Sequence, residues 1–287
     1  VHYYLQALLW MIFVVDYWIP QIYSTVLTVA GLFCFYTATT IIVKDAWVGI
    51  VIGILFFFSP LFNAYAFRAM PDAYALATLN MSFYAVVVFI QKQRIRSLVI
   101  AIILLSLTGM VKIFYMTPYL AFLPVIIWDL CHKKTLHFKW GHFIVFLIPL
   151  ALSLWWIKVM RDYNVSVDHH YFLVDILPYW RLDHEAKKAV WTMIKGEWVY
   201  QMFNFFFFRL SLVFGFVSLV FFFFMKEYKW MAFLILSILG VLAFDVLIYL
   251  QSAHHDYYFL THLFLVIGVW ITFFAGLRAL APKTFYT

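Results

Sequence analysis

Long, unbroken apolar runs are the feature that most constrains this chain. They occupy residues 21–43, 46–62, 73–91, 97–111, 113–129, 141–160, 205–224, 229–250 and 257–277. A helix needs about 20 apolar residues to cross the hydrocarbon core of a bilayer. Strands that cross a membrane alternate apolar and polar residues, and these runs do not alternate. The sequence therefore predicts an all-α polytopic membrane protein, a single transmembrane domain over 1–287 with about nine crossing helices.

Composition excludes the other broad classes of protein. Hydrophobic residues make up 67% of the chain and charged residues 11%, whereas a soluble globular domain has about 25% charged residues. Cys34 and Cys131 form no metal-binding pair by spacing, and we expect no disulfide between them. The net charge of +7 comes from bases that cluster between apolar runs. We therefore expect membrane lipids around the chain and no nucleic-acid partner.

The basic residues predict which way the helices run. Connections rich in Lys and Arg face the cytoplasm. Both 92–96 and 131–140 are rich in bases, so the chain between them must cross the membrane twice. Runs 97–111 and 113–129 are then a hairpin with its outer tip at 109–112, rather than one broken helix. The bases assigned to the inner face are Lys44, Lys92, Arg94, Arg96, Lys133, Lys134, Lys139, Lys226, Lys229, Arg278 and Lys283.

Two segments are predicted to lie on the outer surface. Residues 1–15 carry aromatic side chains and a single Gln, which favours an interfacial helix. The long connection 161–204 contains a second candidate surface helix. Its apolar face follows helical spacing. The residues of that face are Leu182, Ala186, Val190, Ile194 and Trp198.

Ionisable residues gather at the outer face. Charged groups at a membrane edge are costly and are therefore functional candidates. Cations beside a carboxylate and imidazoles suit a substrate that bears phosphate. Three of the candidate sites also have a structural interpretation. Pro71-Asp72 is typical of a helix start, Arg68 can extend toward the interface, and Lys112 can fix the topology of the chain. The candidates are His2, Arg68, Asp72, Lys112, His254, His255, Asp256 and Tyr257.

Metal binding stays open at this stage. Asp168-His169-His170 and His254-His255-Asp256 could together hold a divalent ion, although such spacing is generic. Asp245 is the one residue predicted to be charged deep within a span, where we expect it to pair with a hydroxyl or a His. The sequence has no Gly-rich phosphate loop and none of the GxSxG, HExxH or CxxC motifs. A cytoplasmic enzyme that uses nucleotides is therefore not indicated.

Several segments resemble the polyprenyl-phosphate-sugar-dependent glycosyltransferases of the GT-C fold, the bacterial relatives of protein O-mannosyltransferases and aminoarabinose transferases. The stretch FFFSPLFNAYAFRAMPDAYALATLNMSFY (56–84) is similar to the family's second outer loop, with Ser59-Pro60, Arg68 and Pro71-Asp72 matching its pattern. LSLTGMVKIFYMTPYLAFLP (105–124) resembles its short hairpin with a Lys at the tip. HDYYFL (255–260) resembles a late outer motif of the family. HYYLQALLW (2–10) resembles the interfacial helix of the first outer loop, although the prolines that usually follow its first residue, His2, are absent.

The resemblance implies an inverting glycosyltransferase of the bacterial inner membrane, with its active site at the periplasmic face. Its donor would be a polyprenyl-phosphate-linked sugar, and its acceptor a lipid, a glycan or a protein. Arg68 and Lys112 would bind the donor phosphate, while Asp72 would act in catalysis by orienting the acceptor or assisting a metal. His2, His254, His255, Asp256 and Tyr257 would line the site. The family's catalytic acid lies before the interfacial helix, so we expect it upstream of Val1, in a chain that is incomplete at this end.

Two other functions remain open from the sequence. One is a non-catalytic membrane subunit or scaffold that keeps the fold without the acid. The other is a transporter of lipid-linked sugars, which requires a polar path through the spans.

Overall fold

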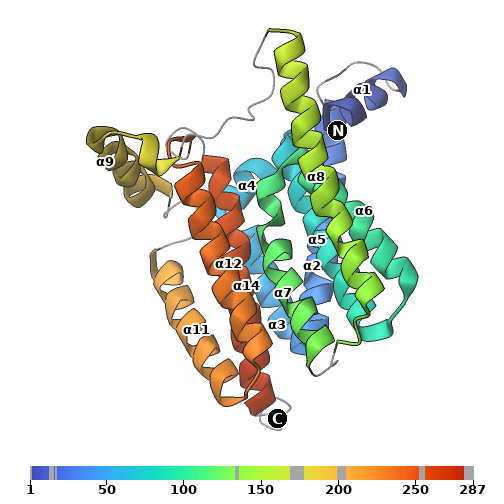
Figure 1. The fold of residues 1–287 in the computed structure, drawn as a ribbon, viewed down its shortest axis with the longest axis vertical. Coiled ribbons are helices and arrows are strands. Elements are labelled where there is room, and N and C mark those ends of the chain that lie inside the picture. The colour runs from blue at the N-terminus through green and yellow to red at the C-terminus, as the bar shows by residue number, and fades with distance from the viewer. Residues whose placement is uncertain are drawn as a thin grey trace.

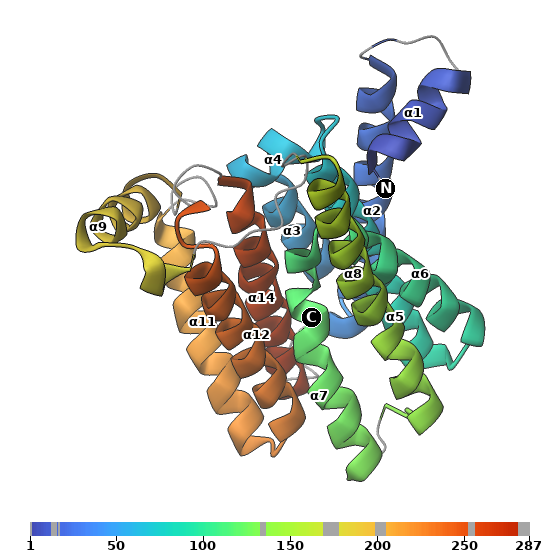
Figure 2. The ribbon, with the colours of Figure 1, turned by 45° about the horizontal axis from the view of Figure 1, so that its top comes forward.

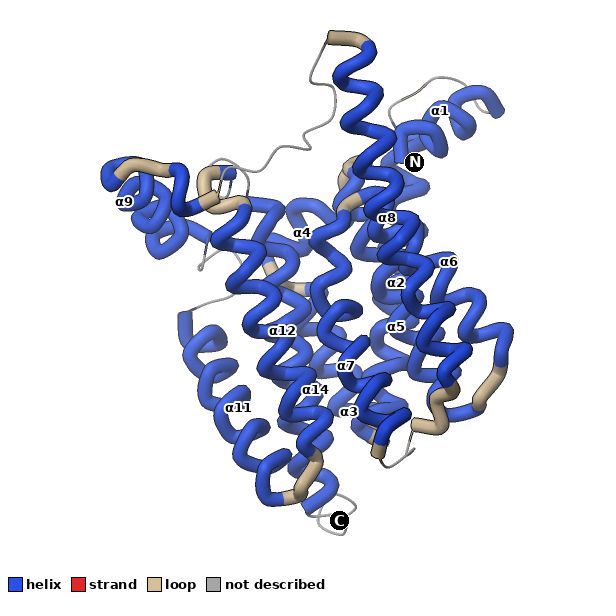
Figure 3. The backbone as a smooth tube through the Cα atoms, in the orientation of Figure 1, coloured by secondary structure: helices blue, strands red, loops and turns tan. Residues whose placement is uncertain are grey.

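The computed structural model describes residues 2–12, 16, 18–132, 136–168, 178–198, 205–251 and 256–280. Within these residues every regular element is a helix and no strand occurs, as Figure 3 shows. The predicted all-α fold is therefore confirmed.

The helices follow the predicted apolar runs closely. Each run begins or ends within a few residues of a helix, because helix-forming apolar residues continue until a polar turn intervenes. In chain order the helices are α1 (His2–Ile12), α2 (Trp18–Val43), α3 (Ala46–Phe57), α4 (Pro60–Ala66), α5 (Pro71–Lys92), α6 (Ile95–Val111), η1 (Ile113–Met116), α7 (Thr117–Cys131), α8 (Trp140–Ser166), η2 (Tyr179–Arg181), α9 (His184–Met193), η3 (Ile194–Trp198), α11 (Phe205–Phe224), α12 (Tyr228–Leu247), η4 (Asp256–Phe259) and α14 (Leu260–Leu280).

The described residues contain fewer clear membrane crossings than the nine that the sequence predicts. Among the described residues seven helices are long and apolar enough to span a bilayer, or eight if the bent pair α3–α4 is one span. The remaining candidate, α6, has 17 residues and is short for a crossing. The predicted total of nine requires both the bent pair and α6 to cross.

The run 46–62, predicted as one span, is two helices. α3 ends at Phe57 and α4 continues at an angle of 73° to it. The break has a local cause: the Ser59 hydroxyl accepts a hydrogen bond from the Phe62 amide at 3.4 Å, and Pro60 occupies the first turn of α4. A Ser cap followed by Pro is a strong helix start, so the chain begins a new helix here instead of extending the old one.

The helices form one bundle with α5 near its centre. α5 packs against α2 and α6, α6 packs against α8, and α7 packs against α12. Figures 1 and 2 show these helices aligned roughly along the long axis of the molecule, with α11, α12 and α14 together on one side. Every residue from Asp72 to Asn80 on α5 is buried, whereas α8, α11 and α12 expose many large apolar side chains. Such a distribution is typical of a bundle whose outer helices face lipid.

The bundle has two chemically different ends. The turns after α2, α5 and α11 carry Lys44, Gln93 and Lys226 in the left-handed region, and they share one end with the C-terminal end of α14 (Figure 1). The connection from α6 through η1 to α7 is at the opposite end, together with α4 and η4 (Figure 1). α6 and α7 run in opposite directions from it, so the hairpin interpretation is correct.

Helices occur in both segments for which surface helices are predicted, with different bounds. α1 covers most of 1–15, and α9 with η3 lies in 161–204. Val190 is buried and Leu182, Ala186 and Ile194 are half-buried, as the predicted apolar face requires, while the Trp198 side chain is outside the described residues. The connection begins later than predicted, because α8 continues as a helix to Ser166. Likewise α14 begins at Leu260 rather than 257, because 256–259 form the 3-10 turn η4.

Candidate functional site

Asp72 is the centre of a buried polar cluster at the end of the bundle that carries η1. It is the second residue of α5, following Pro71, so it lies at the positive end of the helix dipole. Its side chain is only 1% exposed, and both carboxylate oxygens have partners. The structural interpretation of Pro71-Asp72 as a helix start is correct, yet a place in the first turn does not by itself require burial with two partners.

Lys112 is the first partner of Asp72. Its ammonium Nζ lies 3.0 Å from Asp72 Oδ2, and its side chain is 16% exposed. Lys112 stands between α6 and η1, where the backbone is extended rather than helical. Burial lowers the pKa of the Lys112 ammonium, and the Asp72 carboxylate opposes that shift by stabilising the charged form. Such a cation binds an anion strongly once water is excluded.

Tyr115 is the second partner, and the sequence did not single it out. Its hydroxyl donates a hydrogen bond to Asp72 Oδ1 at 3.0 Å, and the side chain is buried. Tyr115 follows Lys112 by three residues, on the 3-10 turn η1. A phenol hydroxyl inside an apolar segment needs a polar partner, and that requirement was the one available signal.

Arg68 lies four residues before Asp72 in the connection between α4 and α5. Its side chain is exposed, with Cζ 6.0 Å from the centre of the Tyr65 ring. Within the described residues no ion pair involves Arg68. The guanidinium is therefore a charged group at the same end of the molecule that an anionic ligand can reach.

Three aromatic rings form a wall beside Lys112, which we call the aromatic wall: Phe114, Phe244 and Tyr258. The Phe114 ring lies 5.1 Å from Phe244 and 5.2 Å from Tyr258, centre to centre. Lys112 Nζ is 5.3 Å from the Phe114 ring and 6.0 Å from the Tyr258 ring. The wall joins η1, α12 and η4, and its rings cover part of the Lys112 side chain.

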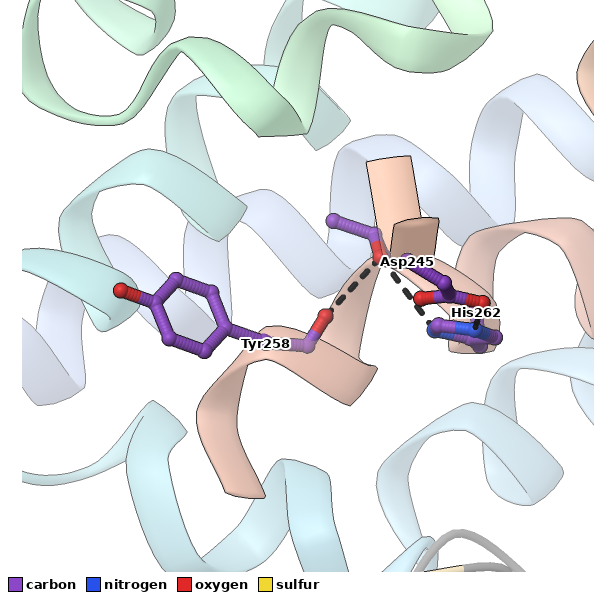
Figure 4. A network of polar contacts seen from close by, with 4 residues as sticks. Asp245, Tyr258 and His262 are labelled. Carbon is purple, nitrogen blue, oxygen red and sulfur yellow. Dashed lines mark hydrogen bonds and ion pairs between the residues drawn. The ribbon is translucent and has the colours of Figure 1, made fainter. Parts of the chain in front are cut away.

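Asp245 also has the kind of partner the sequence predicted. His262 Nε2 lies 2.9 Å from Asp245 Oδ2, which links α12 to α14 (Figure 4). Asp245 is in the last turn of α12 rather than deep within a span, so the sequence placed it at the wrong depth. A transporter requires a polar path through the spans, and this correction removes the one charge that was predicted along such a path within the described residues.

The remaining candidates are only partly described. His2 is in α1 and Asp256 and Tyr257 are in η4, but their side chains are outside the described residues. His254 and His255 lie outside them altogether, as do His169 and His170. Within the described part of the chain no three His, Cys, Asp or Glu residues lie close enough together to hold a metal ion. Cys34 and Cys131 are free thiols.

Comparison with protein families gives one result that covers this cluster. Residues 1–156 match the family described as dolichyl-phosphate-mannose-protein mannosyltransferase. Comparisons with curated proteins and with solved structures found no match to the chain. The matched region contains Arg68, Asp72, Lys112 and Tyr115, and ends within α8. Because the match covers more than half of the chain, the protein belongs to this family of glycosyltransferases.

Proposed function

We propose that the protein transfers a sugar from a polyprenyl-phosphate donor to a hydroxyl or amine of a lipid, glycan or protein acceptor. One observation carries the proposal: the region matched to the mannosyltransferase family is the region that brings Asp72, Lys112 and Tyr115 into contact. Mannose is the sugar indicated by the family description.

Sugar transfer places its main electrostatic demand on the leaving phosphate. The acceptor forms a bond to the anomeric carbon on the face opposite the phosphate while the bond from that carbon to the phosphate oxygen breaks, so the product is inverted. The electron pair of that bond stays on the phosphate, and negative charge grows there in the transition state. Preorganised cations at this position supply the largest single contribution to catalysis in many enzymes.

Arg68 and Lys112 are suited to that charge in different ways. Arg68 is exposed, and its planar guanidinium can bind two phosphate oxygens at once. Lys112 is largely buried beside the aromatic wall, where its charge is poorly screened by water. In this proposal Arg68 captures the donor phosphate and Lys112 stabilises the charge that develops during transfer.

Asp72 has a task in the proposal that follows from its contacts. Both of its oxygens are occupied, by Lys112 at 3.0 Å and by Tyr115 at 3.0 Å. This arrangement supports a role in fixing the ammonium in place and keeping it charged, more than a role in contacting the acceptor or a metal. The proton of the acceptor would pass to a carboxylate base of the first outer loop, as the resemblance to the family implies.

We place the reaction on the outer face, periplasmic in a bacterial inner membrane. The turns with Lys44, Lys92, Arg94 and Lys226 lie at the end opposite to η1 (Figure 1). Bases of that kind face the cytoplasm. The site end then faces outward, where lipid-linked donors replace nucleotide sugars.

The test uses membranes that contain the full-length protein and labelled polyprenyl-phosphate mannose. We expect the donor to be consumed with transfer of label, and Arg68→Ala and Asp72→Asn each to abolish transfer at unchanged expression. Movement of intact donor across the membrane without consumption would instead identify a transporter. A donor that is neither moved nor consumed would identify a scaffold, and near-normal transfer by both variants would refute the roles of these residues.

A further inference from the structure

Asp245 and His262 form a polar pair that the proposed reaction does not use. Their side chains are 25% and 17% exposed, and His262 Nε2 lies 2.9 Å from Asp245 Oδ2. Asp245 belongs to the last turn of α12 and His262 to the first turn of α14. The pair therefore ties together two helix ends that are separated by a connection containing η4.

The same pair is linked to the backbone of Tyr258. Thr261 Oγ1 donates to the Tyr258 carbonyl oxygen at 2.9 Å and lies 3.4 Å from His262 Nδ1. Figure 4 shows Asp245 facing His262, with the Tyr258 ring directed away from the pair. The His262 ring also stacks on Phe259 at 4.8 Å. One ring thus holds α12 through Nε2 and the residues of η4 through its other contacts.

The far side of η4 reaches the phosphate-binding lysine. The Tyr258 ring is 6.0 Å from Lys112 Nζ, and Phe244, the residue before Asp245, is 6.0 Å from Tyr258. Two of the three rings of the aromatic wall are therefore attached to the elements that the Asp245–His262 pair joins. We therefore expect a change in the spacing of α12 and α14 to move these rings relative to Lys112.

We propose that Asp245 and His262 are positioning residues, which hold the aromatic wall against Lys112 by fixing the end of α12 to the start of α14. The effect on sugar transfer rests on the proposed function, whereas the effect on Lys112 does not. Asp245 and His262 lie outside the region matched to the family, so they add a contribution from the second half of the chain to a site built mainly by the first half.

Histidine geometry allows a sharp choice of variants. Nε2 is the nitrogen that faces Asp245, so it must carry a proton to donate to the carboxylate. The terminal amide nitrogen of Gln occupies nearly the same place as Nε2, whereas that of Asn occupies the place of Nδ1. His262→Gln should therefore preserve the contact with Asp245, and His262→Asn should lose it. Ser211→Ala is a matched control, because it removes another hydrogen bond to α14, from Trp270 Nε1 at 2.7 Å.

The readout is the titration of Lys112 itself, followed in the full-length protein by trace acetylation across a pH series and mass spectrometry. Opening the wall admits water and favours the charged ammonium. We expect Asp245→Ala and His262→Asn to raise the pH midpoint of the Lys112 titration by about half a pH unit or more. His262→Gln and Ser211→Ala should leave this midpoint unchanged. In the transfer assay the first two variants should lower kcat more than they raise KM, because the charge on the phosphate develops during the chemical step.

An unchanged Lys112 midpoint in His262→Asn would overturn the positioning role, and so would equal behaviour of His262→Asn and His262→Gln. These two variants decide the question even if Asp245→Ala fails to fold. The titration needs no donor, so failure of the proposed function leaves its result intact. Conversely, a raised midpoint without measurable transfer in the wild type would support the positioning role and refute the enzyme.

Discussion

At the scale of single residues, the balance of charge around Asp72 dominates the site. Asp72 is removed from water and Lys112 is largely so, and neither charge can be buried alone at acceptable cost. Tyr115 adds a second contact to the carboxylate, which leaves no oxygen of Asp72 unsatisfied. The cluster is therefore a unit in which each group depends on the others.

We predict that Asp72→Ala lowers the free energy of unfolding by about 3–5 kcal/mol, because Lys112 would remain buried without its carboxylate. The double variant Asp72→Ala, Lys112→Met should recover more than half of this loss, since no unpaired charge remains. Denaturation by SDS in mixed micelles measures the free energy of unfolding of the single and the double variant. Arg278→Gln is the control: it removes the half-buried partner of Asp45 at 3.0 Å and should cost less than Asp72→Ala, because Asp45 is less deeply buried than Asp72. Equal losses in the single and double variants would contradict a buried ion pair.

A second prediction at this scale concerns pH. Burial disfavours the charged form of Lys112, so its pKa lies below the ordinary lysine value and the proton leaves at lower pH than from an exposed lysine. Sugar transfer should accordingly fall as the pH rises through that lowered pKa. Lys112→Arg keeps its charge and should move this alkaline decline to higher pH. A decline at the same pH in Lys112→Arg would show that another group titrates.

At the scale of helices, close packing of α2 on α5 fixes the position of Asp72. Gly31 of α2 lies so near α5 that an added Cβ would be 2.9 Å from the Ala77 Cα. Contacts through small residues of this kind let helix backbones approach closely in membranes. Because the obstacle is backbone, it cannot rotate away as a side chain could.

Gly31→Ala should therefore destabilise the protein by about 1–3 kcal/mol through overpacking. It should also reduce sugar transfer, since α5 carries Asp72. Gly268→Ala is the matched control on α14, where an added Cβ meets nothing within 4 Å, and the better helix propensity of Ala should stabilise it by up to about 1 kcal/mol. The comparison uses the same micelle denaturation, and similar effects of the two substitutions would exclude close α2–α5 contact.

The elements themselves were predictable because apolar runs are a local property of the sequence. The hairpin at Lys112 also followed from the sequence, through the charges of the flanking turns. The 73° bend between α3 and α4 did not, although the Ser59-Pro60 motif stands at the break. A Ser-Pro start shows where a new helix can begin, but its direction depends on the helices it packs against.

The contacts between the site residues were less predictable from the sequence than which residues belong to the site. Asp72 and Lys112 were both assigned to the outer face, yet they are 40 residues apart and nothing local required them to touch. Tyr115 was overlooked because a tyrosine in an apolar segment resembles packing until its hydroxyl finds a carboxylate. For Asp245 the sequence allowed a hydroxyl or a His, and only the alignment of α12 with α14 selects His262.

At the scale of the whole molecule, the bases in the short turns opposite to the site predict the orientation of the protein in the membrane. In a background of Cys34→Ser and Cys131→Ser, a cysteine at exposed Ala69 should react with an impermeant maleimide only from the outer side. A cysteine at exposed Arg94 should react only from the cytoplasmic side. Sealed membrane vesicles of known orientation provide the test. Labelling of both positions from one side would contradict the proposed topology.

The central claim is that Lys112 stabilises the departing phosphate, and single-turnover sugar transfer tests it most directly. Lys229 provides a matched control: it is a buried lysine paired with Glu227 at 3.4 Å, but it stands at the start of α12, at the opposite end of the bundle. We predict that Lys112→Met slows transfer by about 100-fold or more, while the donor still binds through Arg68. Lys229→Met should keep the wild-type rate of transfer per folded molecule. Wild-type transfer by Lys112→Met would contradict the claim.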